Sequence, residues 1–149
     1  MHLQTRRHGD REKRWGITTN DLPARLSMSN SNRAPVQLLL IEDNPTDAAF
    51  VTRLLESNPE LPFTVDHVTS LGNALTTLEA ADYDVAILDL SLPDADGLES
   101  FDQIRAFDAR LPVVVFTDED DENLALAAIE SGAQDFMAKG YVTGQMMFR

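Results

Sequence analysis

Five short apolar runs divide the sequence after residue 35, and the segments between them show a different hydrophobic spacing. Most of these runs are continuous, as in strands that are buried on both faces of a sheet, whereas residues 63–68 alternate between apolar and polar. We predict strands at residues 37–41, 63–68, 84–88, 112–116 and 134–138.

The interval after the first strand predicts a helix. Asn44 and Pro45 suit an N-cap followed by proline at the first helical position, and Asp47 then stands at the third position. An apolar stripe that begins near Val51 extends this helix to about Ser57.

Three further stripes predict helices after the second, third and fourth strands. The first of these helices is capped by Ser70, the next covers about residues 97–108, and the last is ended by Gly132. A final helix begins after Gly140 and is short, because few residues remain before Arg149.

Strands that alternate with helices predict an α/β fold with one parallel sheet and helices on both of its faces. A length of 149 residues suits a single domain with one substantial core. In open parallel sheets, ligands bind outside the carboxyl ends of the strands. The residues that directly follow each strand are therefore the candidates for function.

The first 33 residues differ from the rest of the chain. They show no hydrophobic periodicity and are rich in Arg, Asn and Ser, so we predict a disordered tail at 1–33 and a folded domain at 34–149. The tail has a net charge of +4 and the remaining residues have a net charge of −17. A basic interaction arm is the alternative interpretation of the tail, and whether translation starts at Met1 or Met28 stays open.

Composition excludes several classes of function. The acidic body repels phosphate backbones, so we expect no direct contact with nucleic acid. The sequence has no cysteine, which excludes disulfides and thiolate metal sites. It has no secretory signal and no apolar run near the roughly 20 residues that span a bilayer. We expect a cytoplasmic protein that does not contact a membrane.

Five polar side chains follow four of the predicted strands. Glu42 and Asp43 follow the first strand, Asp89 the third, Thr117 the fourth and Lys139 the fifth. Each alone is explained as an ordinary exposed polar residue, but together they place three carboxylates, a hydroxyl and an amine on one solvated rim. Crowded carboxylates repel one another unless a cation neutralises them, and hard oxygen ligands favour Mg²⁺.

The sequence resembles the response-regulator receiver domains of two-component signalling in four blocks, which occur in the family's order and spacing: IEDNPTDA, VAILDLSLPDADGLE, VVVFTDE and GAQDFMAKG. The resemblance covers about residues 36–149. It implies a flavodoxin-like, doubly wound, five-stranded parallel sheet with strand order 2-1-3-4-5. It also implies a phosphoprotein of a phosphorelay, which is a signalling domain and not an enzyme.

The resemblance gives a role to each acidic residue of the rim. Glu42 and Asp43 match the acidic pair that holds Mg²⁺, and the backbone carbonyl of Ser91 matches a further protein ligand. Asp89 matches the phosphoacceptor, which also contacts the metal. In this family the acceptor attacks the phosphorus of a phosphohistidine and becomes an aspartyl phosphate.

The remaining residues match the part of the family's site that responds to phosphate. Thr117 matches the hydroxyl that bonds a phosphoryl oxygen, and Lys139 matches the lysine that pairs with the phosphate. Phe136 matches the aromatic residue whose rotamer follows Thr117, which changes the face made by the fourth helix and the fifth strand. The implied partners are a histidine kinase or histidine phosphotransfer protein and an unknown downstream protein, and a phosphorylation-dependent homodimer stays open.

Three positions depart from the family pattern. Gly140 follows Lys139 where the family usually has proline, so the family's cis peptide bond lacks its usual residue. Asp118 follows Thr117 where small residues are usual, and it adds a negative charge near the phosphoryl approach. Phe136 has no hydroxyl, so a switch at this position relies on packing alone.

Other classes fail on specific residues. A haloacid-dehalogenase-type phosphatase needs a second Asp two positions after Asp89, where Ser91 stands. An EF-hand loop with Gly97 at its sixth position has Leu92 first and Gln103 twelfth, so both key ligands are missing. The sequence also lacks a P-loop motif and a glycine-rich dinucleotide turn. The alternative that remains is a receiver-shaped docking module that signals without phosphorylation.

Overall fold

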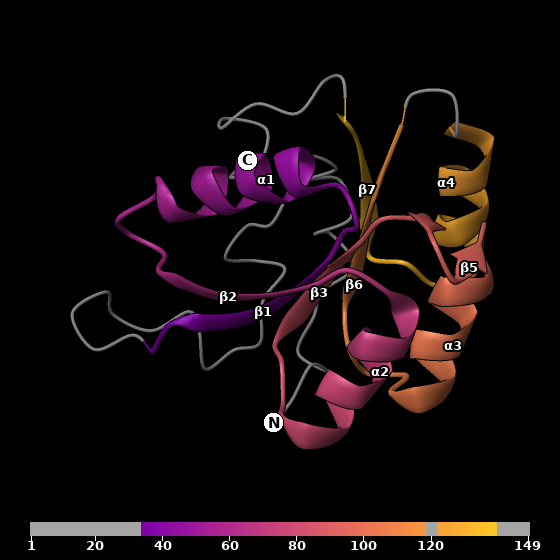
Figure 1. Ribbon diagram of the computed structural model, residues 1–149, viewed down its shortest axis with the longest axis horizontal. Helices are drawn as coiled ribbons and strands as arrows, with labels where there is room; N and C mark the ends of the chain where they lie inside the picture. Colours follow the sequence, from indigo (N-terminus) through magenta and orange to yellow (C-terminus); the bar gives the residue numbers. More distant parts are fainter. Residues whose placement is uncertain (1–33, 119–121, 140–149) are drawn as a thin grey trace.

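The computed structural model describes residues 34–118 and 122–139, which form a central sheet between two layers of helices (Figure 1). The predicted tail at 1–33 and the predicted last helix after Gly140 lie outside these residues. The peptide bond between Lys139 and Gly140 lies outside them as well.

In the described part of the chain, no helix combines the length and the apolar character that crossing a bilayer requires.

The sheet has five strands in the order β2-β1-β3-β6-β7, and all neighbouring strands are parallel. The strands are β1 (Val36–Ile41), β2 (Phe63–Val68), β3 (Val85–Leu88), β6 (Val113–Thr117) and β7 (Asp135–Ala138). Counted along this sheet alone, the order is 2-1-3-4-5. The predicted flavodoxin-like fold and its strand order are therefore confirmed.

The burial of each strand explains its hydrophobic pattern. Every residue of β3 and β6 is buried, because these strands lie inside the sheet and have helices on both faces. Strand β2 lies at the edge, and its partly buried and exposed positions largely alternate. The continuous runs of β1, β3 and β6 thus correspond to interior strands and the alternating run of β2 to an edge strand, whereas β7, at the other edge, is mostly buried.

Helices cover the two faces of the sheet unequally among the described residues (Figure 1). One face packs against α1 (Pro45–Glu56), and the other packs against α2 (Leu71–Ala80), α3 (Glu99–Phe107) and α4 (Glu122–Glu130). Each face has its own apolar cluster, so the sheet separates two cores.

The predicted starts of α1 and α2 are confirmed in atomic detail. Oδ1 of Asn44 accepts hydrogen bonds from the backbone N–H groups of Thr46 and Asp47, at 2.9 and 3.1 Å. Pro45 is the first residue of α1, as expected for a residue without an N–H donor. Oγ of Ser70 accepts a hydrogen bond from Asn73, 3.1 Å away, at the start of α2.

Between β3 and α3 the chain forms a feature that the hydrophobic pattern does not predict. It is a short antiparallel hairpin, β4 (Ser91–Leu92) with β5 (Ala95–Asp96). Asp94, at the tip of this hairpin, accepts hydrogen bonds from Leu71 N and Gly72 N, both at 2.9 Å. The hairpin is thus attached to the N-terminus of α2, where a carboxylate also interacts favourably with the helix dipole.

Helix α3 begins two residues later than predicted. Gly97 has a φ of 58°, which lies outside the right-handed helical region, so the helix cannot include it. The helix begins at Glu99, and its buried face includes Phe101 and Ile104.

Gly132 ends the region of α4 as the sequence predicts. Its φ is 119°, and its N–H donates to the carbonyl of Ile129, 3.0 Å away. The guanidinium of Arg105 on α3 lies against this glycine where a Cβ would point, although such a flexible side chain could move aside. The positive φ is therefore what favours glycine here.

Candidate functional site

The ends of two neighbouring strands bring the first carboxylates together. The backbone N–H of Glu42 donates to Val68, 3.0 Å away, and that of Asp89 donates to Ile41, 2.9 Å away. Both residues therefore continue the hydrogen-bond ladder of the sheet by one position. Their side chains start from rigid backbone and not from a loose loop.

Three carboxylates form a compact cluster at this edge. One ligand oxygen each from Glu42, Asp43 and Asp89 lies within 4.8 Å of the other two. Glu42 and Asp89 are buried, whereas Asp43 is exposed, so the cluster is open to solvent on one side. Such a set of hard oxygen atoms could hold a divalent cation.

Glu42 has an unusual protonation behaviour for a carboxyl group. Its burial, followed by a hydrogen bond with Asp89, raises its pKa to about 8, although the backbone N–H of Asn44 acts in the opposite direction. That N–H lies 3.1 Å from Oε2 of Glu42. Nε2 of His67 also lies 2.7 Å from the carbonyl oxygen of Glu42, and it must donate because a carbonyl only accepts.

Lys139 joins the cluster from β7. Its Nζ lies 3.2 Å from Oδ2 of Asp89, 3.1 Å from Oε1 of Glu42 and 3.0 Å from Oδ2 of Asp47. The ring of Phe116 lies beside the same ammonium, 5.4 Å from Nζ to the ring centroid. The side chain of Lys139 is only 14% exposed, so the ammonium is more enclosed than the predicted solvated rim implied.

The charge of Lys139 is held firmly. Partial burial acts to lower its pKa, but the hydrogen bond with Asp47 and the charges of Asp89 and Glu42 outweigh this and raise the pKa above its ordinary value. At neutral pH the side chain is therefore an ammonium at the centre of the acidic cluster.

The hairpin after β3 orients Asp89. The backbone N–H of Ser91 donates to Oδ1 of Asp89, 3.0 Å away, while Oδ2 of the same carboxylate faces Lys139. Ser91 itself is exposed and pairs with Asp96 across the hairpin. The two oxygens of Asp89 thus have different partners, which fixes the plane of the carboxylate.

Thr117 and Phe136 lie on neighbouring strands. Thr117 is the last residue of β6 and pairs with Ala138, directly before Lys139. Phe136 pairs with Val115 and is buried in the apolar cluster beneath α3 and α4. Because alternate residues of a strand share a face, Thr117 and Val115 point to the same side as Phe136. The structure therefore places Thr117 above Phe136 on one face of the sheet.

Comparison with known proteins identifies the family. The family model described as the response regulator receiver domain matches residues 38–148. The chain belongs to the response-regulator receiver family.

Receiver domains of transcriptional regulators are among the similar curated proteins. QseB of Haemophilus influenzae is 32% identical over 114 residues, and BasR of Escherichia coli is 31% identical over 114 residues. Each alignment covers 76% of this chain and 50% of the relative. The chain therefore spans about half the length of these relatives.

Solved structures share the receiver fold. The phosphorylated cyanobacterial phytochrome response regulator RcpA aligns with a TM-score of 0.65 and 26% identity, over 76% of this chain and 87% of RcpA. The receiver domain of NtrX from Brucella abortus aligns with a TM-score of 0.67 over 74% of this chain and 90% of that domain. Its identity of 23% supports the fold alone.

Membership of this family has general consequences. Receiver domains are signalling domains of two-component systems, in which they interact with sensor kinases. They generally bind Mg²⁺ at an acidic pocket, and Glu42, Asp43 and Asp89 form an acidic cluster in this receiver domain.

Sequence reasoning missed one residue of the cluster. Asp47 contacts Lys139, which lies 92 positions further along the chain, but the sequence analysis placed Asp47 only in the first turn of α1. The position of Asp47 in the sequence could have indicated this contact. The first turn of α1 directly follows β1, so it starts at the same edge of the sheet as Glu42. An acidic residue at a helix start already has a local explanation, and this concealed the distant contact.

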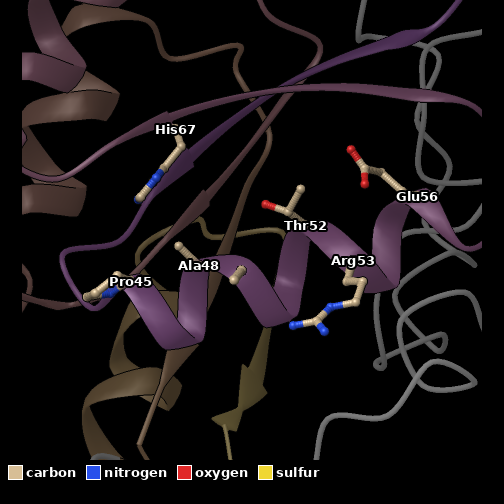
Figure 2. A pocket seen from close by; sticks show the side chains of 7 residues that line it. Pro45, Ala48, Thr52, Arg53, Glu56 and His67 are labelled. Atoms are coloured by element: carbon tan, nitrogen blue, oxygen red, sulfur yellow. The ribbon is translucent and has the colours of Figure 1, made fainter.

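A groove on the outside of the receiver domain lies apart from the acidic cluster (Figure 2). It has a volume of about 450 Å³ and runs along α1, where His67 of β2 faces Pro45 and Ala48. Neither Asp43 nor Asp89 contributes to its lining. The groove and the acidic cluster are therefore separate features, and the hydrogen bond between His67 and Glu42 links them.

Proposed function

We propose that this receiver domain, residues 34–149, accepts a phosphoryl group on Asp89 in the presence of Mg²⁺. The donor is a phosphohistidine of a sensor kinase or of a histidine phosphotransfer protein. The observation that carries the proposal is the environment of Asp89, a buried carboxylate with Lys139 3.2 Å away and two further carboxylates within 4.8 Å. Such a group is oriented for reaction and lies next to a fixed positive charge.

The residues present suit Mg²⁺. The cluster offers only oxygen atoms, and one of its members, Glu42, is held partly in its protonated form by crowding and burial, which a divalent cation would reverse. Glu42, Asp43, Asp89 and the backbone carbonyl of Ser91 would hold the ion. When bound, Mg²⁺ supplies positive charge next to the phosphoryl oxygens.

The protein's own groups then have distinct tasks. A carboxylate oxygen of Asp89 forms a bond to phosphorus while the bond between phosphorus and the histidine nitrogen breaks, and the electron pair of that bond stays on the imidazole. The ammonium of Lys139 stabilises the negative charge on the transferred group. Thr117 donates its hydroxyl to a phosphoryl oxygen.

The signal passes from Thr117 to Phe136. Movement of Thr117 towards the phosphate opens space on the face that it shares with Phe136, and the ring turns into that space. The surface of α4 and β7 changes as a result and becomes available to a downstream protein or to a second phosphorylated copy. The domain acts as a phosphoacceptor in the cytoplasm and catalyses at most its own phosphorylation and slow dephosphorylation.

Beryllofluoride, an analogue of the phosphoryl group, tests the proposal without a cognate kinase. We expect ¹⁹F NMR to show a bound signal with the wild-type protein only when Mg²⁺ is present, and no bound signal with Asp89→Asn. The alternative function, a docking module independent of phosphorylation, would be supported if the folded wild-type protein bound no beryllofluoride at saturating Mg²⁺.

A further inference from the structure

We propose that Asp47 restrains Lys139 in the unphosphorylated protein and competes with the phosphoryl group for its ammonium. The inference rests on the proposed function and adds a regulatory residue to that site. Asp47 lies within the block IEDNPTDA, but the resemblance assigns it no role, and the role proposed here follows from its contacts.

Among the three carboxylates that pair with Lys139 in the described residues, Asp47 is the one closest to the ammonium. Nζ lies 3.0 Å from Oδ2 of Asp47, compared with 3.1 Å to Glu42 and 3.2 Å to Asp89. The hydrogen bond with Asp47 is also the largest of the influences that raise the pKa of Lys139. Asp47 is therefore a principal partner of this lysine and not a marginal neighbour.

An ammonium has three N–H donors. Here it donates hydrogen bonds to Asp47 and Asp89, and Oε1 of Glu42 lies 3.1 Å away as an ion-pair partner. A phosphoryl group on Asp89 needs at least one of these donors. The interaction with Asp89 passes naturally to the phosphoryl group, because both belong to the same side chain. The bond to Asp47 has no such continuation, so it opposes the movement of the ammonium from its present position towards the added phosphoryl group.

The first turn of α1 holds Asp47 in its competing position. Its backbone N–H is bonded to Oδ1 of Asn44, 3.1 Å away, and a carboxylate at the third helical position is favoured by the helix dipole. The ligand atoms of the cation cluster come from Glu42, Asp43 and Asp89 and do not include Asp47. Its side chain is 33% exposed, so after release its carboxylate can be solvated by water.

Removing the charge of Asp47 while keeping its shape isolates this effect. Asp47→Asn retains a side-chain oxygen but no longer competes as an anion for Lys139. Glu56→Gln is the matched control, because it removes one negative charge from the opposite end of the same helix. Thermal melts verify that both variants are folded before they are compared.

The first measurement needs neither metal nor phosphate. The chain has two lysines, Lys13 and Lys139, so an amine-reactive reagent followed by peptide mass spectrometry reports on Lys139 with Lys13 as an internal reference. We expect Asp47→Asn to increase the modification rate of Lys139 relative to Lys13, and Glu56→Gln to leave the ratio unchanged. An unchanged ratio in Asp47→Asn would overturn the restraint.

The second measurement tests the competition itself. In a ¹⁹F NMR titration with beryllofluoride and Mg²⁺, we expect Asp47→Asn to bind about two- to fivefold more tightly than wild type, as for a partly exposed ion pair. Glu56→Gln should match wild type. Equal or weaker binding by Asp47→Asn, with normal wild-type binding, would overturn the competition alone. No binding by wild type would instead overturn the proposed function, and the competition with it.

Discussion

Nζ of Lys139 lies 3.2 Å from Oδ2 of Asp89, although the two residues are 50 positions apart in the sequence. Their strands, β3 and β7, are not neighbours, because β6 lies between them. The lysine side chain therefore reaches across the end of β6, where Thr117 stands, to meet the carboxylate. A parallel sheet in this order collects the amine, the hydroxyl and the carboxylate at one edge.

The pKa of Glu42 predicts how the stability of the metal-free protein depends on pH. Its value of about 8 in the folded protein exceeds the ordinary 4.5, so between these values the folded state binds more protons than the unfolded state. The free energy of unfolding should therefore fall as the pH rises from 4.5 to 8. Chemical denaturation across this range, compared with Glu42→Gln, measures the contribution. If the free energy of unfolding changed with pH in the same way in wild type and Glu42→Gln, the predicted contribution of Glu42 would be contradicted.

Asp43→Ala should stabilise the metal-free protein and abolish the effect of Mg²⁺. Asp43 is exposed and lies within 4.8 Å of two other carboxylates, so its removal relieves repulsion and loses little packing. We expect a rise of a few degrees in melting temperature at low ionic strength and a smaller rise in high salt, where charges are screened. A lower melting temperature without metal would show that repulsion does not dominate at this position.

Lys139→Ala should destabilise the metal-free protein, in contrast to Asp43→Ala. It leaves the carboxylates of Glu42, Asp89 and Asp47 without their shared cation. We expect a loss on the order of 2 kcal/mol in the free energy of unfolding, as for a lost hydrogen bond between charged groups. Saturating Mg²⁺ should recover part of this loss. Chemical denaturation of wild type and Lys139→Ala, with and without Mg²⁺, measures both effects. An unchanged free energy of unfolding in the metal-free variant would mean that Lys139 is not the counterion of the cluster.

Asp94→Ala should weaken the attachment of the β4–β5 hairpin to α2. The carboxylate accepts two hydrogen bonds from the start of α2, both of 2.9 Å, and these bonds lower its pKa. We expect the melting temperature to fall by several degrees, while the exposed Asp82→Ala serves as a control for loss of charge. Hydrogen exchange at Leu71 and Gly72 should accelerate only in the first variant. Unchanged hydrogen exchange at Leu71 and Gly72 would contradict the role given to Asp94.

The sequence predicted the sheet and most of the acidic cluster because both follow from local patterns. Continuous apolar runs indicate buried strands. In a parallel sheet, the residues that follow these strands lie at one edge, and this rule predicts the positions of Glu42 and Asp89. Asp47 was missed because an acidic residue at a helix start already has a local explanation. The enclosure of Lys139 was also missed, because exposure depends on which side chains surround the ammonium and not on its strand position.

The hairpin after β3 shows a second limit of sequence patterns. Pro93 and Asp94 indicate a turn, but nothing local shows that the flanking residues pair or that Asp94 reaches α2. The late start of α3 depends on the positive φ of Gly97, which glycine permits but does not require. Such features are decided by tertiary contacts.

Phosphorylation of Asp89 is the central claim, and intact-mass spectrometry after treatment with acetyl phosphate tests it most directly. With Mg²⁺, the wild-type protein should gain the mass of one phosphoryl group. Without Mg²⁺ it should gain none, and Asp89→Asn should gain none under either condition. A wild-type protein that stays unmodified, or an Asp89→Asn variant that is still phosphorylated, would contradict the assignment of Asp89 as the phosphoacceptor.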